Sequence, residues 1–167
     1  GNAVAAHDIE ASIYGTTLGM TGTGIPTQGG HGLHMRAINK VRAVGSIAAA
    51  VEQGIITDGI MRACVLHEVP FVLAASIRDD GPLPDVITDM LQAQDAMRRH
   101  TMQATMAVMI ASALHGIATG NMLPAFVTDA AGSMRELITI CVDSSEFVVN
   151  KLKDRGTHQA FGVVTNA

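Results

Sequence analysis

The sequence is poor in the residues that mark several classes of protein. Its 167 residues include no tryptophan, and aromatic residues make up 3% of the chain. The two cysteines, Cys64 and Cys141, form no CxxC pair, which argues against a disulfide framework or a metal site and favours a reducing compartment. No apolar run is long enough to span a bilayer, and we find no signal-peptide pattern at the start. We therefore expect a cytoplasmic protein with no metal and no membrane partner.

Clusters of basic residues are also missing. No more than two Lys or Arg residues are adjacent anywhere in the chain, and the formal net charge is −4. Proteins that bind nucleic acid neutralise its phosphates with clustered basic side chains. The sequence therefore predicts no nucleic-acid partner.

Small and aliphatic residues are plentiful. Hydrophobic residues make up 48% of the chain, which also has 17 glycines and 10 methionines. Such a core packs closely, and small residues favour α/β folds in which backbone approaches backbone or a ligand. The length suits one domain, so we predict a single Rossmann-like domain over residues 1–167. Residues 1–6 resemble a strand end that runs into a helix, so we expect the domain to be incomplete at its N-terminus and to be a fragment of a longer enzyme.

Hydrophobic periodicity predicts an alternation of helices and strands. The predicted helices are 7–14, 33–44, 47–53 after an N-cap at Ser46, a helix capped by Thr57 or Asp58 that runs to 67, 86–100, and one capped by Ser144 or Ser145 that ends at 155. Residues 15–32 are predicted to form a loop, and 115–121 a helix or a broken turn. The predicted strands are 69–75, 105–111, 137–143 and 161–165. This order predicts an α/β fold with a Rossmann-like parallel sheet flanked by helices.

The loop after the predicted strand 69–75 carries an unusual concentration of charge. It holds one cation, three carboxylates and a glycine, which are Arg78, Asp79, Asp80, Asp85 and Gly81. Ligands of parallel sheets bind at the carboxyl ends of the strands, and two prolines restrict the backbone of this loop. The alternative is a solvated turn followed by a helix that starts with proline. The position after a buried strand favours a functional loop.

A second candidate is Asp143, at the end of the predicted strand 137–143. Dinucleotide-binding folds commonly hold a ribose hydroxyl with an acidic residue at this place. The alternative role is the N-cap of the following helix. No G-x-G-x-x-G sequence follows a predicted strand, so we expect the phosphate-binding turn to be of another type or to lie outside the chain.

Two further segments are candidates for cofactor binding. Glycines and an asparagine after a strand can present N–H groups to a phosphate, which nominates Gly120, Asn121 and the nearby His115. A Gly-Asn turn that opens a helix can do the same, which nominates Gly1, Asn2, Ala3, His7 and Asp8. The alternatives are an ordinary capped helix and a frayed N-terminus. His31 and His34 lack a further ligand at metal-site spacing, so we predict a loop that closes over substrate there rather than a metal.

Several long segments carry a family resemblance. HDIEA, IRDDGPLPDVITD, LHGIATGNMLP and CVDSSEFVVNKLKDRGTHQAFGVVTN are the most specific of them. Through these segments the chain resembles the C-terminal NAD-binding half of the LOR/SDH-type ornithine cyclodeaminases of archaea, which also forms the C-terminal part of cyanobacterial arginine dihydrolases. The resemblance extends from one end of the chain to the other. It implies a Rossmann-like domain that binds NAD, in an enzyme that is a homo-oligomer.

The resemblance also implies a reaction. Hydride leaves Cα of L-ornithine, the δ-amino group attacks the resulting imine, ammonia departs, and the hydride returns to give L-proline. On this hypothesis Asp79, Asp80 and Asp85 bind the amines and transfer protons, Arg78 holds the substrate carboxylate, and Gly81 belongs to the cofactor site. Which aspartate is the base stays open. The alternatives are another NAD-dependent amino-acid oxidoreductase, of the saccharopine or lysine type, and a nucleotide-binding module without catalysis.

Overall fold

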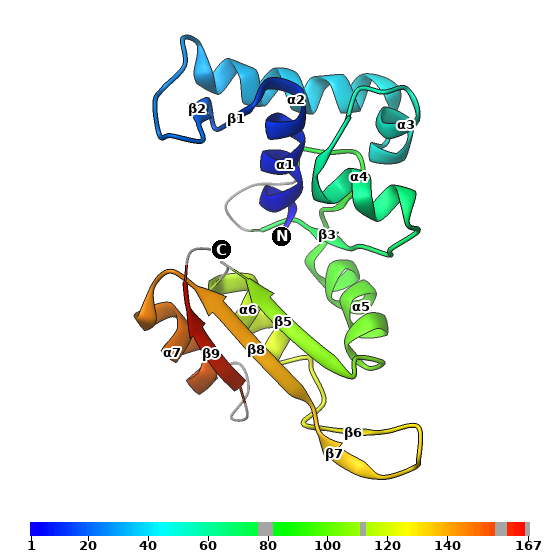
Figure 1. Cartoon of the computed structure of the whole chain (residues 1–167). Helices are drawn as coiled ribbons and strands as arrows, with labels where there is room; N and C mark the ends of the chain where they lie inside the picture. Colours follow the sequence, from blue (N-terminus) through cyan, green and yellow to red (C-terminus); the bar gives the residue numbers. More distant parts are fainter. Residues whose placement is uncertain (77–81, 111–112, 156–159, 166–167) are drawn as a thin grey trace. The chain divides into compact units, whose positions relative to one another are not determined.

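The chain has two compact units, each with its own core. In the computed structural model, residues 1–76, 82–110, 113–155 and 160–165 are described. They divide into a first unit, Gly1–Gln94, and a second unit, Asp95–Ala167, and we treat each by itself (Figure 1). The division falls inside helix α5 (Met90–Thr101). That residues 1–167 form one domain stays a prediction.

Most of the first unit is helical. Its helices before α5 are α1 (Asn2–Tyr14), α2 (Gly30–Val44), α3 (Ile47–Glu52) and α4 (Gly59–Leu66). Its strands form two short pairs, of which β1 (Thr16–Thr17) and β2 (Met20–Thr21) are antiparallel, while β3 (Leu73–Ala74) and β4 (Val86–Ile87) are parallel. The predicted helices between residues 33 and 67 are confirmed, and the hydroxyl of Ser46 accepts the N–H of Ala49, as an N-cap should.

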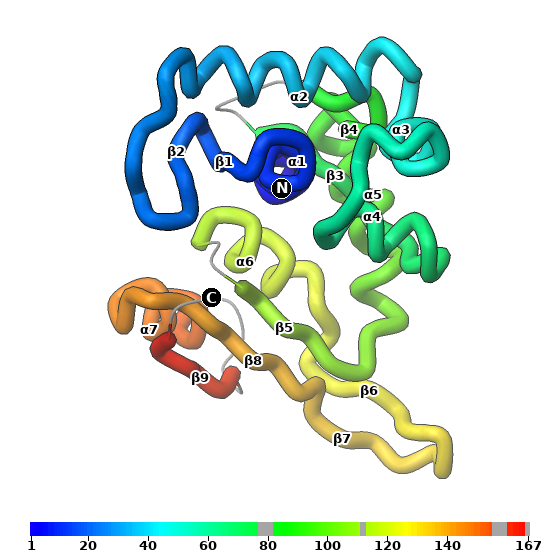
Figure 2. Tube along the Cα trace, turned by 45° about the horizontal axis from the view of Figure 1, so that its top comes forward, coloured from blue at the N-terminus to red at the C-terminus, as the bar shows by residue number. Residues whose placement is uncertain are grey.

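Helix α1 packs against both α2 and α4, in the middle of the first unit (Figure 2). Ala5, Ala6 and Ile9 lie on its buried side, and the small alanines let the neighbouring helices approach closely. Gly15 ends the helix in a left-handed conformation, and its N–H bonds back to the carbonyl of Ala11. The prediction of a strand end before residue 7 is wrong, because the helix already begins at Asn2.

The predicted strand 69–75 is mostly wrong. Only Leu73 and Ala74 pair with another strand, and the side chains of Val69 and Phe71 are 50% and 36% exposed. A strand needs a neighbour to bond its backbone, and the partner β4 is only two residues long. The predicted helix 86–100 begins later than expected, at Met90, because Val86 and Ile87 belong to β4.

The second unit is built on a parallel sheet, as predicted. Strands β5 (Met106–Ile110), β8 (Ile138–Asp143) and β9 (Ala160–Val164) lie in the order β5-β8-β9. Helix α6 (Ala113–Gly120) leads from β5 toward β8, and α7 (Glu146–Arg155) connects β8 to β9 (Figure 1). This βαβαβ arrangement with adjacent strands is one half of a Rossmann fold.

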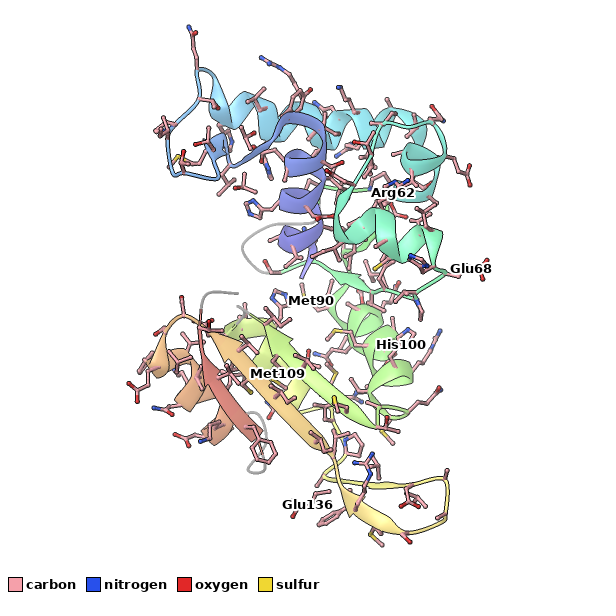
Figure 3. The ribbon with its side chains drawn as sticks, in the orientation of Figure 1. Arg62, Glu68, Met90, His100, Met109 and Glu136 are labelled. Carbon is pink, nitrogen blue, oxygen red and sulfur yellow. The ribbon has the colours of Figure 1, made fainter. Side chains whose placement is uncertain are left out.

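The two faces of this sheet differ. One face packs against α6 and α7 and buries Met109, Cys141, Leu152 and Ala160, and Figure 3 shows Met109 on β5. The other face carries apolar side chains that are largely exposed, among them Met106, Val108, Ile110, Phe161 and Val163. Within the described residues β5 is therefore buried on one face only.

A hairpin between α6 and β8 was not predicted. It consists of β6 (Phe126–Thr128) and β7 (Met134–Glu136), paired antiparallel. The Asp129 carboxylate accepts the N–H groups of Ala131 and Ser133, each at 2.9 Å, and shapes the turn. No helix in the described residues is long and apolar enough to cross a membrane.

Candidate functional site

The first unit contains a buried carboxylate, that of Glu10 on α1. One oxygen accepts the Thr16 hydroxyl and the Gly19 N–H, each at 2.8 Å. The other accepts the Leu18 N–H at 2.8 Å and Nδ1 of His34 at 2.7 Å. The carboxylate is fully buried, so these donors replace the water that it would otherwise bind.

The β1–β2 turn is shaped to supply two of these donors. Leu18 and Gly19 form its two central residues and both have positive φ, at 49° and 70°, as a type I′ hairpin requires. A leucine in this conformation is strained, which is typical of residues held for a function. A Cβ on Gly19 would lie 2.1 Å from Cα of Gly30, so both positions need glycine for the hairpin to reach the start of α2.

The environment of Glu10 favours its ionised form. Burial by itself would raise the pKa of this carboxyl group. The bonds from Gly19, His34, Thr16 and Leu18 stabilise the carboxylate and together hold the pKa below its ordinary value. Glu10 is therefore a fixed negative charge at neutral pH.

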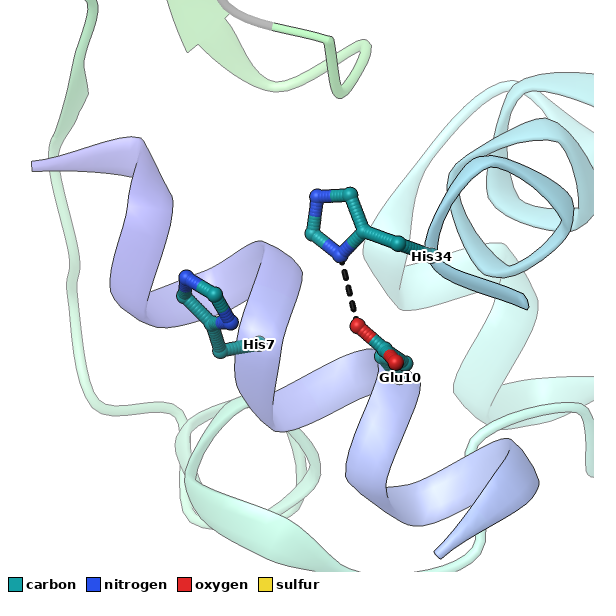
Figure 4. A group of neighbouring side chains, drawn as sticks. All are labelled: His7, Glu10 and His34. Atoms are coloured by element: carbon teal, nitrogen blue, oxygen red, sulfur yellow. Dashed lines mark hydrogen bonds and ion pairs between the residues drawn. The ribbon is translucent and has the colours of Figure 1, made fainter. Parts of the chain in front are cut away.

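Glu10 in turn fixes the ring of His34 on α2 (Figure 4). A carboxylate can only accept, so we assign the proton of this bond to Nδ1. Nε2 of the neutral ring is then an acceptor on the side away from Glu10. The rings of His7 and His31 flank His34, with centroids at 5.4 and 6.3 Å.

His7, Glu10 and His34 also have the composition of a metal site. One ligand atom from each lies within 4.8 Å of the others. However, each oxygen of Glu10 already accepts two hydrogen bonds, which occupies the lone pairs that a carboxylate offers. The geometry fits a carboxylate–imidazole pair better than a metal centre.

Asp8 and Ser12 face another side of α1 and hold the start of α4. The two oxygens of Asp8 accept the N–H groups of Ile60 and Met61 at 2.9 and 2.8 Å. The hydroxyl of Ser12 accepts the N–H groups of residues 57 and 58. Asp8 therefore caps α4 from a distant part of the chain, and its predicted role in cofactor binding stays a prediction.

The charged loop is described only at its C-terminal end. Arg78, Asp79, Asp80 and Gly81 lie outside the described residues. Oδ2 of Asp85 accepts the N–H of Ile47 at 2.9 Å, at the start of α3. Asp85 therefore has a structural task, and its predicted catalytic role stays a prediction.

The remaining candidates of the first unit lie at the start of α1. Gly1 is the N-cap and is exposed, Asn2 is buried, and Ala3 is half-buried. They belong to the first unit, whereas the β5-β8-β9 sheet belongs to the second. Their cofactor-binding role stays a prediction, as does that of His7.

Asp143 stands where the sequence predicts it, as the last residue of β8. Its backbone pairs with Val164 of β9, at the carboxyl edge of the parallel sheet. Oδ1 accepts the N–H of Ser145 at 2.8 Å, in the turn that leads into α7. Its other oxygen accepts no hydrogen bond from the described part of the chain, and we call it the open oxygen.

Helix α6 follows β5 and places the other candidates of the second unit. Its first residue, Ala113, is nearest the carboxyl end of β5, whereas Gly120 and Asn121 lie at the opposite end of the helix. Their predicted contact with a cofactor phosphate at the sheet edge finds no support in this position. His115 lies in the first turn of α6, at the end of the helix that is nearer to the carboxyl end of β5.

The β5–α6 connection carries a variant of the dinucleotide fingerprint in which only one of the three glycines is present. Residues 111–116 read A-S-A-L-H-G, with alanine at the first two glycine positions of G-x-G-x-x-G and glycine at the third. The third glycine of that fingerprint permits close helix packing. A Cβ on Gly116 would lie 2.7 Å from Cδ2 of Leu152 on α7 and 3.7 Å from Sδ of Met109 on β5.

Sequence reasoning also missed the pairing of Glu10 with His34. Two pairs at a spacing of three, His7 with Glu10 and His31 with His34, each lie on one side of a helix. The spacing shows which residues share a side of a helix. It does not show that these two helices bring their pairs together.

Comparison with known proteins places these features in a family. The sequence model for the family described as "Arginine dihydrolase ArgZ-like, C-terminal, Rossmann fold" matches residues 1–167. An ornithine cyclodeaminase of Methanopyrus kandleri is 55% identical over 167 residues, which are 99% of this chain and 38% of that protein. The chain thus spans less than half the length of this relative.

Two solved structures are similar along nearly the whole chain. A conserved LOR/SDH protein of Methanococcus maripaludis S2 has a TM-score of 0.87 and 49% identity over 99% of this chain and 46% of that one. The ternary complex of AgrE with ornithine and NAD⁺ has a TM-score of 0.84 and 47% identity over 99% of this chain and 23% of that one. The predicted resemblance and the predicted Rossmann-like α/β fold are both confirmed.

Proposed function

The chain belongs to the family of C-terminal Rossmann-fold domains of ArgZ-like arginine dihydrolases, and from this membership we propose that it binds NAD as part of an ornithine cyclodeaminase. The full-length protein would convert L-ornithine to L-proline and ammonia without net oxidation or reduction. The structural observation that carries the proposal is the position of Asp143 at the carboxyl edge of the parallel sheet. The solved complex of a relative with ornithine and NAD⁺ supports it.

The second unit has the groups that a dinucleotide needs. The open oxygen of Asp143 suits a ribose hydroxyl, because an ionised carboxylate accepts from an alcohol. The start of α6 offers the positive end of a helix dipole to a pyrophosphate. Gly116 lets α6 lie close to β5 and α7, which fits the third position of a dinucleotide fingerprint.

Charged side chains of the chain are the candidates for binding the substrate. When bound, NAD supplies a hydride acceptor that returns the hydride within the same cycle. Arg78 is the candidate that holds the substrate carboxylate, and Asp79 and Asp80 are the candidates that bind its amines. Asp85 is a weaker candidate, because its carboxylate already caps α3.

The test is an assay of the full-length protein with NAD⁺ and L-ornithine. We expect proline and ammonia in equal amounts and no accumulation of NADH. Bound NAD without proline from ornithine would refute the proposed activity. Net NADH with lysine would instead favour an amino-acid oxidoreductase, and the absence of any turnover a nucleotide-binding module. Light scattering of the same sample tests the proposed homo-oligomer.

A further inference from the structure

We propose that Nε2 of His34 transfers protons between the substrate amines, and that Glu10 is the residue that positions it. This inference rests on the proposed function and deepens it, since it names a proton-transfer group for the amine chemistry. The sequence had suggested only a closing loop around His31 and His34. The geometry of the described residues points to a specific atom.

The ring of His34 has a fixed orientation. Oε2 of Glu10 lies 2.7 Å from Nδ1 of His34, and three other donors hold the same carboxylate in place. A histidine whose Nδ1 is bound to a buried carboxylate presents Nε2 as its proton acceptor, which is the arrangement of a general base. Glu10 thus fixes both the tautomer and the direction of the ring.

Glu10 and His34 differ in their exposure to solvent. The side chain of Glu10 has no exposed surface, whereas that of His34 is 13% exposed. A ligand can therefore meet the imidazole but not the carboxylate. Glu10 is for this reason a positioning residue, and His34 is the group that would touch substrate.

Further contacts fix the hairpin that surrounds the Glu10 carboxylate. Thr27 donates its N–H and its hydroxyl to the carbonyl of Gly19, at 2.8 and 2.7 Å, and so fixes the hairpin that supplies two of the donors. The hairpin accepts a strained leucine and a close contact between two glycines. Functional groups need such rigid support to keep their geometry.

The proposed step balances without any added reactant. Nε2 of His34 takes a proton from the δ-ammonium group of the substrate, which frees an electron pair on nitrogen. That pair forms a bond to the imine carbon at Cα, the π electrons of the imine move to the original nitrogen, and this nitrogen takes the proton from Nε2. Nε2 then takes a second proton from the δ-nitrogen and delivers it to the original nitrogen. The electron pair freed on the δ-nitrogen forms the C=N bond of the ring as the bond from Cα to the original nitrogen breaks and ammonia leaves, so the imidazole ends the cycle as it began.

The variant that tests this role is His34→Asn in the full-length protein. The asparagine amide nitrogen takes the place of Nδ1 and can still donate to Glu10, but nothing replaces Nε2. We expect kcat for proline formation to fall by about 100-fold or more, the usual contribution of a general acid or base. The KM for ornithine, the thermal midpoint and the affinity for NAD should stay close to those of the unaltered protein. The side of the pH profile of kcat that reports this base should also disappear.

Two further variants complete the experiment. His100→Asn is the control, because His100 is an exposed histidine in the last turn of α5 and makes no hydrogen bond to Glu10; its kcat should not change. Glu10→Gln should lower kcat more than it raises KM, with Glu10→Asp restoring part of the loss. Because Glu10→Gln can also fail to fold, His34→Asn decides the question.

The outcomes separate the inference from the proposed function. If the unaltered protein makes no proline, the proposed function falls and this inference with it. If the unaltered protein is active and His34→Asn retains its kcat and pH profile, only this inference falls. Loss of activity with a chelator, restored by Zn²⁺ alone, would also overturn it, in favour of a metal at His7, Glu10 and His34.

Discussion

The two units hold their polar groups in different ways. In the first unit Glu10 and His34 come from separate helices and are joined by a hydrogen-bond network that includes a strained turn. In the second unit Asp143 stands at a sheet edge where the strand order alone places it. The first kind of site depends on many contacts, whereas the second depends on the topology of the fold. Removing the carboxylate should therefore cost mainly stability at Glu10 and mainly ligand affinity at Asp143.

The largest effect should come from Glu10→Ala. Removing the carboxylate leaves four buried or partly buried donors without their acceptor. Breaking such a buried charged network typically costs about 3–5 kcal/mol. Chemical denaturation monitored by circular dichroism would measure it. A loss below about 1 kcal/mol, the size expected of an exposed pair, would contradict the network described for the first unit.

In the second unit, Leu152→Ala should have the largest effect, because apolar packing holds that unit. Leu152 is 0% exposed, and Cδ2 of this side chain fills the space left by Gly116. Such truncations cost about 2–5 kcal/mol. Phe147→Ala on the same helix is the control, since Phe147 is 70% exposed and should cost far less. Equal losses in the two variants would mean that the described core is not the one that stabilises the unit.

Asp8→Ala should have a smaller effect on stability and none on the affinity for NAD. It removes the acceptor of two N–H groups at the start of α4, and a lost cap costs about 0.5–2 kcal/mol. Asp58→Ala is the matched control, because the side chain of Asp58 makes no capping bond. If Asp8→Ala weakens NAD binding without loss of stability, the cofactor role predicted from sequence is right after all.

How much of this could be predicted from the sequence depends on the same contrast. Asp143 was found because the run of apolar residues before it identifies the strand, and a parallel sheet places strand ends at one edge. Helix ends were found through local signals such as Ser46. The short strand β3 was predicted too long, because its hydrophobic run says nothing of how short its partner is.

The network around Glu10 could not be predicted because its partners are distant in sequence. His34 lies 24 residues away, and the backbone donors depend on a turn whose leucine gives no sign of positive φ. The capping bonds of Asp8 could not be predicted for the same reason, since its partners at the start of α4 are 52 and 53 residues away. A single sequence shows the type of each residue but not which distant residue forms a hydrogen bond with it.

The smallest expected effect is a change of stability with pH. The pKa of Glu10 in the folded chain lies below its ordinary value of 4.5. The contribution of the ionised Glu10 to the stability of the fold is therefore complete above pH 4.5 and is lost as the pH falls through the lower pKa of the folded chain. We expect the thermal midpoint of the unaltered protein to fall more steeply in this acid range than that of Glu10→Gln. Glu52→Gln, an exposed glutamate on α3, should keep the unaltered slope. Parallel slopes for all three proteins would remove the special role of Glu10.

The central claim is that the second unit binds the cofactor and the first supplies proton transfer. Titration of NAD⁺ into the unaltered full-length protein, Asp143→Ala and His34→Asn, followed by kcat at saturating NAD⁺, tests it most directly. We expect Asp143→Ala to weaken NAD binding and to keep most of its kcat, and His34→Asn to bind NAD normally with kcat reduced. Unchanged NAD affinity in Asp143→Ala, or equal changes of affinity and kcat in both variants, would contradict the claim.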